Sequence, residues 1–151
     1  MMKFKSILAV LALGVAAMSA HALEVGATFG VDTGSVRNST GVVVAQRFGG
    51  TELAVSAERF TRYNNDQNRY SLIAKQDVAS FGPVALNVQG GASYLQNQTA
   101  PSGYAGQVGV GASVPVAKNV FATLDLRHQF GQQSVNKFNG NTATIGLRYQ
   151  F

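Results

Sequence analysis

From residue 23 onward the sequence alternates between apolar and polar side chains with a period of two, as a β-strand with one apolar face does. The clearest segment is 142–151, where the apolar positions are Ala143, Ile145, Leu147, Tyr149 and Phe151. The same alternation recurs in seven other segments, at residues 23–32, 41–48, 51–63, 69–78, 84–95, 104–116 and 120–130. The pattern therefore predicts an all-β fold of eight strands.

The connections between these strands alternate in length. Short connections at 49–50, 79–83 and 117–119 alternate with longer ones, rich in Asn, Gln, Ser, Thr and Gly, at about 33–40, 64–68, 96–103 and 131–141. Three short and four longer connections are what an eight-stranded antiparallel up-and-down barrel needs. We expect the short turns at one end of the barrel and the longer loops at the other.

The polar face indicates which way such a barrel turns its apolar side. A soluble barrel faces it inward, whereas a transmembrane barrel faces it toward lipid and encloses a polar lumen. Here the polar face combines nearly balanced charges with many Gly, Ser and Thr, which fits a narrow lumen. Besides Glu24, Arg47, Glu52 and Asp77, it holds the five residues that we predict to form a charge network in the lumen: Glu58, Lys75, Asp125, Arg127 and Arg148.

Eight strands enclose an interior that side chains just fill. Buried charges are costly unless they are paired, so we expect the network to plug the lumen by pairing across it. A gated ion path or a narrow passive pore is the alternative.

Aromatic residues gather near both ends of the predicted strands, whereas the aromatics of an ordinary core would cluster mid-strand. Rings at the two membrane interfaces form the girdles of a membrane barrel. The predicted girdle residues are Phe48, Tyr63, Tyr70, Phe81, Tyr94, Tyr104, Phe121, Phe130 and Tyr149. Together these features predict an eight-stranded antiparallel up-and-down transmembrane β-barrel.

Residues 1–22 have the layout of a cleaved signal peptide, which leaves 23–151 as the barrel domain. Lys3 and Lys5 precede an apolar run at 7–17, and Ala20-His21-Ala22 supplies small residues for cleavage. The apolar run is too short to span a membrane as a helix, which takes about 20 residues. Cleavage would lower the formal net charge from +5 to +3, which is too weak and scattered to indicate a nucleic-acid partner.

Composition narrows the candidate chemistry further. The 151 residues contain no Cys and two His, so neither a lipoprotein anchor nor a cysteine-based metal site is expected. We predict no metal and no cofactor.

The C-terminal segment 146–151, Gly-Leu-Arg-Tyr-Gln-Phe, ends in an aromatic residue with apolar residues at alternate positions before it. It resembles the last strand of small eight-stranded bacterial outer-membrane β-barrels, the class that includes porin-like and opacity-type surface proteins. The resemblance implies that Leu147, Tyr149 and Phe151 act as an assembly signal. It implies a monomer in the outer membrane, with both termini and the short turns in the periplasm.

The same resemblance implies the partners: outer-membrane lipid and lipopolysaccharide, the barrel-assembly machinery and periplasmic chaperones. Two positions fit the pattern poorly. Arg59 and Gln46 share the parity of the lipid-facing side of their strands. For Arg59 this requires either a β-bulge or a side chain that snorkels at the rim.

The predicted role is structural or surface-interacting, and not enzymatic. The enzymatic alternative is a lipid A-modifying hydrolase, because His128 has outward parity and its setting resembles that in lipid A deacylases. Those barrels place a serine two residues after the histidine, whereas this chain has Phe130 there, and Ser134 falls in a loop. The adjoining strand offers no outward carboxylate. A soluble periplasmic barrel that binds a small ligand is a third possibility.

Overall fold

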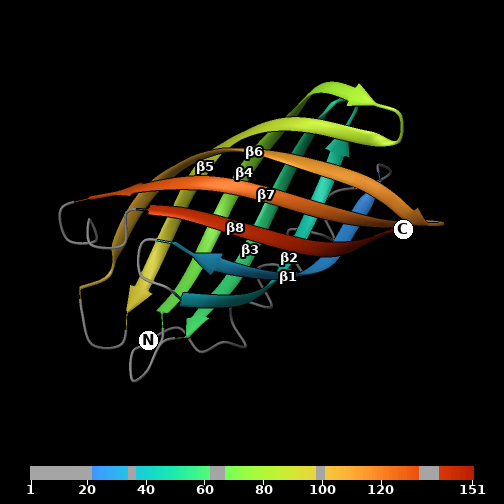
Figure 1. Ribbon diagram of the computed structural model, residues 1–151. Helices are drawn as coiled ribbons and strands as arrows, with labels where there is room; N and C mark the ends of the chain where they lie inside the picture. The colour runs from blue at the N-terminus through green and yellow to red at the C-terminus, as the bar shows by residue number, and fades with distance from the viewer. Residues whose placement is uncertain (1–21, 34–36, 62–66, 98–100, 133–139) are drawn as a thin grey trace.

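The computed structural model of the chain describes residues 22–33, 37–61, 67–97, 101–132 and 140–151 (Figure 1). Residues 1–21 of the expected signal peptide, Tyr63 and Ser134 lie outside these residues. Cleavage after Ala22 stays a prediction. Within the described part of the chain, no helix is long and apolar enough to cross a membrane.

Eight antiparallel strands pair in chain order, and the last pairs with the first to close a barrel. They are β1 (Leu23–Asp32), β2 (Arg37–Phe48), β3 (Thr51–Thr61), β4 (Gln67–Phe81), β5 (Val84–Asn97), β6 (Gly103–Ala117), β7 (Val120–Gly131) and β8 (Gly140–Gln150). This confirms the predicted fold class.

Three two-residue turns join strands at one end of the barrel, which we call the turn end; the opposite end is the loop end. The turns are residues 49–50, 82–83 and 118–119. Gly49 and Gly82 have φ values of 62° and 58°, and Asn119 has 60°. A positive φ is tolerated best by Gly and Asn, so the local sequence fixes these reversals.

Several strands extend beyond the predicted bounds. β2 begins at residue 37 rather than 41, β4 spans 67–81 rather than 69–78, and β6 begins at residue 103. The sequence predicts loops at the polar residues near the loop end. In the barrel they continue the hydrogen-bonded ladder, with Asp32 opposite Arg37 and Gln67 opposite Asn97.

The register sets the tilt of the strands. Followed from partner to partner around all eight strands, it leads from Tyr104 on β6 back to β6 at Val114, ten residues further along. With the usual rise per residue and strand spacing, this offset corresponds to a tilt of about 40°. One residue then advances about 2.6 Å along the barrel axis, and one step to the next strand about 3 Å.

Apolar side chains cover the outside of the barrel and polar side chains fill most of the inside. Leu72, Ile145 and Leu147 are each about 60% exposed, as expected of a surface that contacts lipid. The inward face also has an apolar wall, formed by the buried side chains of Val43, Ala45, Ala54 and Ile73 on β2, β3 and β4. The expectation of a polar inward face therefore holds for only part of the lumen.

Candidate functional site

The lumen is the part of the barrel where functional groups gather. All six acidic residues of the described chain project into it, together with five of the basic residues. All of these residues except Asp32 form three layers along the axis, which we name the turn-end, middle and loop-end layers.

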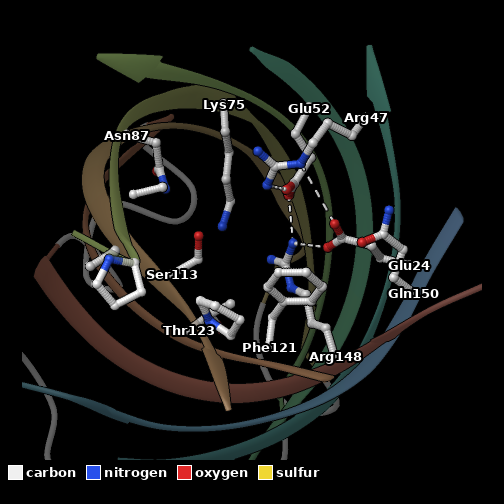
Figure 2. A pocket seen from close by; sticks show the side chains of 14 residues that line it. Glu24, Arg47, Glu52, Lys75, Asn87, Ser113, Phe121, Thr123, Arg148 and Gln150 are labelled. Carbon is white, nitrogen blue, oxygen red and sulfur yellow. Dashed lines mark hydrogen bonds and ion pairs between the residues drawn. The ribbon is translucent and has the colours of Figure 1, made fainter. Parts of the chain in front are cut away.

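The turn-end layer links Arg47 and Arg148 to three carboxylates, of which Glu24 and Glu52 are drawn in Figure 2. Arg148 Nη1 lies 2.6 Å from Glu52 Oε1 and 3.4 Å from Glu24 Oε2. Arg47 lies 3.0 Å from the other oxygen of Glu52 and 2.7 Å from Asp77. Since Glu52 is bridged by two guanidinium groups, this layer joins β1, β2, β3, β4 and β8.

The layer borders a cavity of about 190 Å³ at the turn end. Phe121 lines this cavity and is the register partner of Arg148 on the neighbouring strand. Figure 2 shows its ring beside the Arg148 side chain. The prediction that Phe121 belongs to the outer girdle is therefore wrong: it shares the parity of Asp125 and Arg127, which face inward.

The middle layer is a single buried ion pair. Lys75 Nζ donates to both oxygens of Asp125, at 2.8 and 2.9 Å, and Gln89 Nε2 donates to the same carboxylate at 2.9 Å. Lys75 lies on β4 and Asp125 on β7, so the pair crosses the lumen. Its two members are 5% and 6% exposed, and pairing offsets the cost of their burial.

The loop-end layer surrounds Glu58, which is 3% exposed. Arg69 donates to Glu58 Oε2 through Nε at 2.9 Å and Nη2 at 2.8 Å, and Arg127 Nη2 donates to Oε1 at 3.0 Å. The two arginines also donate to Gln129 and Thr144, at 3.0 Å each. Charge-assisted bonds of this kind are the stronger hydrogen bonds in proteins.

The Glu58–Arg127 pair spans the diameter of the barrel. β3 and β7 are four strands apart in a ring of eight, so the two side chains reach toward each other from opposite walls. Beyond this pair, toward the loop end, Phe60 and Leu95 are both almost fully buried, and the Arg69 guanidinium lies 4.6 Å from the centre of the Phe60 ring. Side chains therefore fill the lumen at this level.

The structure brings the five predicted lumen charges into these three layers, together with residues that the prediction left out of the network. The main omission is Arg69, the first residue of the predicted strand 69–78. It has the same parity as Lys75, and that parity was the signal that could have placed it inside.

Most of the predicted girdle residues project outward. Phe48, Phe81, Tyr94, Tyr104, Phe130 and Tyr149 are 38–69% exposed, and Tyr70 is partly exposed. Tyr70, Tyr94 and Tyr104 occupy one register row across β4, β5 and β6 near the loop end. Phe48 and Tyr149 lie about 25 Å away along the axis by the register count, the usual height of the apolar band.

The proposed assembly residues lie on the outside of β8 and directly after it, at the turn end. Leu147 and Phe151 are 58% and 74% exposed. The Tyr149 and Phe151 rings meet edge to face with their centroids 4.9 Å apart, and the Phe151 amide donates to the Leu23 carbonyl at 2.9 Å. These residues therefore close the β1–β8 seam as well as presenting apolar surface.

His128, the candidate of the enzymatic alternative, faces outward on β7. Its Nδ1 lies 2.8 Å from the Asn141 side-chain oxygen on β8. Position 130, two residues on, holds the exposed side chain of Phe130. Among the described neighbours in the register, Val108 and Asn141 flank the imidazole, so none of them supplies a hydroxyl nucleophile or a carboxylate.

The structure also shows where the two residues with unexpected parity lie. Arg59 is exposed on the outer side of β3, and the ladder from Asn38–Thr61 to Phe48–Thr51 is continuous, so no bulge is present there. Gln46 is only 3% exposed, in the register row between Leu23 and Leu53.

No protein-family model and no curated protein matches the chain. Solved structures are similar over most of its length. The N-terminal β-barrel domain of Pseudomonas aeruginosa OprF matches with a TM-score of 0.70 at 18% identity, covering 87% of this chain and 98% of that one. Neisserial surface protein A matches with 0.70 at 16% identity, covering 86% and 96%.

The outer membrane enzyme PagL is also similar, with a TM-score of 0.55 at 8% identity over 85% of this chain and 98% of PagL. These similarities concern architecture, because the identities are low. The chain has the fold of the eight-stranded outer-membrane β-barrels.

Proposed function

We propose that this protein is an integral outer-membrane barrel with a structural or surface-interacting role and a lumen closed to ion flow. The carrying observation is the Glu58–Arg127 pair, which spans the barrel from β3 to β7. The Lys75–Asp125 pair and the turn-end layer lie behind it on the same axis. An ion that crossed the lumen would have to separate buried charges at each layer, which is costly.

The exterior supports the membrane placement. Its exposed apolar surface is bounded by aromatic rings whose separation of about 25 Å fits the apolar band of a bacterial outer membrane. The partners implied by the sequence belong to the same proposal: the assembly machinery and periplasmic chaperones before insertion, and outer-membrane lipid and lipopolysaccharide after it.

The surroundings of His128 support the non-enzymatic role. Hydrolysis by a histidine-activated nucleophile needs a hydroxyl within hydrogen-bond reach of the imidazole, and the adjoining described side chains bring none. Mass spectrometry of lipid A from cells with and without the protein tests this point. Loss of an acyl chain that depends on His128 would establish the hydrolase instead.

Planar-bilayer recording tests the closed lumen. We expect refolded wild-type protein to give no current above that of the bare bilayer. The Glu58→Ala/Arg127→Ala variant removes the pair that spans the lumen and should give measurable current, whereas Leu126→Ala, the outward neighbour of Arg127, should not. A boiled-versus-unboiled gel shift shows that each variant is folded. Discrete conductance steps from the wild type, as large as those of the double variant, would refute the proposal.

A further inference from the structure

The outer surface of β2, β3 and β4 carries a groove near the loop end, with a volume of about 480 Å³. Two register rows of outward side chains line it. One row is Val42, Ala57 and Tyr70, and the other, closer to the loop end on each strand, is Thr40, Arg59 and Asn68.

The groove follows from the sizes of these side chains. Ala57 stands between Val42 and Tyr70 in its row, so a short side chain is flanked by two larger ones and leaves a hollow. The row toward the loop end adds a hydroxyl, a guanidinium and a carboxamide. The groove is therefore apolar in one half and polar and cationic in the other.

The level of Arg59 along the axis places its charge at the membrane interface. Counted along the register with the rises given above, Arg59 lies about 4 Å from Tyr104 toward the turn end, at a level between those of Tyr94 and Tyr70. Aromatic belts mark the headgroup region of a bilayer. An arginine at this depth can place its aliphatic stem along apolar surface while its guanidinium reaches the headgroups.

The charge of this groove is distinctive on the outer face. Arg47, Arg69, Lys75, Arg127 and Arg148 all project into the lumen. Among the side chains that the structure describes, Arg59 is the one cation on the outer face at the loop end. A ligand that reaches the groove from the membrane and carries both an acyl chain and an anionic headgroup matches its two halves.

We propose that this groove binds the lipid A part of lipopolysaccharide, with an acyl chain over Ala57 between Val42 and Tyr70 and a phosphate on Arg59. The proposal rests on the outer-membrane placement proposed above, since the loop end would then face the leaflet that holds this phosphorylated glycolipid. The guanidinium group of arginine suits a phosphate because its planar fork of donors can form two parallel hydrogen bonds to the phosphate oxygens. Thr40 and Asn68 flank Arg59 and offer hydrogen bonds to the sugar.

Native mass spectrometry of the folded protein in detergent, titrated with purified lipid A, tests the site. Arg59→Gln should weaken lipid A binding about five-fold, the usual contribution of one basic residue near an anionic lipid surface. Ala57→Leu fills the hollow and should weaken binding by a similar factor. Ala143→Leu is the matched control, because Ala143 faces outward on β8 at nearly the same depth and should leave binding unchanged.

Dephosphorylated lipid A and phosphatidylglycerol serve as comparison ligands. We expect Arg59→Gln to have no effect on the dephosphorylated form, and phosphatidylglycerol to bind more weakly than lipid A. Equal binding of lipid A by all variants would overturn the groove as a site. Equal affinity for phosphatidylglycerol would overturn the choice of lipid A as its occupant. Neither result bears on the closed lumen, which the bilayer recordings test separately, and the gel shift shows whether each variant is a folded barrel.

Discussion

Glu58 is the carboxylate whose neutralisation should most destabilise the barrel. It is 3% exposed and accepts three hydrogen bonds, two from Arg69 and one from Arg127. The Glu58→Gln substitution keeps the shape of the side chain and removes its charge. Both guanidinium groups then stay buried beside a neutral amide. Removing one partner of a buried ion pair costs about 3–5 kcal/mol, and we expect the low end, about 3 kcal/mol, because the amide oxygen still accepts one bond.

Urea unfolding of protein refolded into phospholipid vesicles, followed by circular dichroism, measures this loss. With a slope of about 2 kcal/mol per molar urea, the midpoint should fall by about 1.5 M. Ser56→Ala is the matched control, since Ser56 is also buried and inward on β3 but carries no charge. Its midpoint should stay within about 0.5 M of the wild type.

An unchanged midpoint for Glu58→Gln would refute the reasoning. It would mean that the two arginines do not depend on Glu58 for compensation of their charge. The lumen would then have to be described as hydrated rather than ion-paired, and the argument for its closure would lose its main support.

Three further outcomes follow from the structure. Deleting Phe151 should reduce the folded protein found in outer-membrane fractions by immunoblot; wild-type amounts would argue against the C-terminal signal. Gly91→Ala should destabilise the barrel by about 1–3 kcal/mol, because its Cβ would lie 2.1 Å from a backbone carbonyl oxygen of β4, whereas the control Gly90→Ala meets nothing closer than 3.8 Å; equal urea midpoints would contradict this. Lys75→Met should lower the urea midpoint by about 1.5 M or more, because it leaves the buried Asp125 carboxylate without its cation. Lys118→Met, in an exposed turn, should not; a larger effect at Lys118 would count against the middle layer.

The period-two pattern was sufficient for the number of strands. The alternating lengths of the connections indicated their antiparallel order, and the charges and small residues of the polar face indicated which side is inward. Together they placed Glu58, Lys75 and Asp125 inside and Leu147 outside, because each strand alternates between two environments of opposite polarity. Parity alone does not show which charges pair across the lumen. That Glu58 meets Arg127 from the opposite wall depends on the register and on the ten-residue offset, which connect strands far apart in sequence.

The remaining errors have local causes. Phe121 is predicted to belong to the girdle because it lies near a turn, although its parity matches that of Asp125. β2 reads Val42-Val43-Val44-Ala45, an unbroken apolar run in which alternation cannot show that Val43 and Ala45 form part of an apolar wall inside the lumen. At the loop end β2, β4 and β6 begin before their predicted first residues, because the polar residues there are predicted as loop. The groove at Arg59 depends on which side chains share a register row, which the sequence does not show.

The pairing across the lumen has a consequence for how long the folded protein lasts. Glu58 and Arg127 are 69 residues apart in sequence, and Lys75 and Asp125 are 50 apart. Contacts of such separation require the closure of long loops, so we expect them to form late in folding and to contribute little to its rate-limiting step. Interactions absent from that transition state act mainly by slowing unfolding. The ion pairs of the lumen should therefore mainly slow unfolding. Their removal should shorten the lifetime of the folded barrel more than it slows the assembly of the barrel.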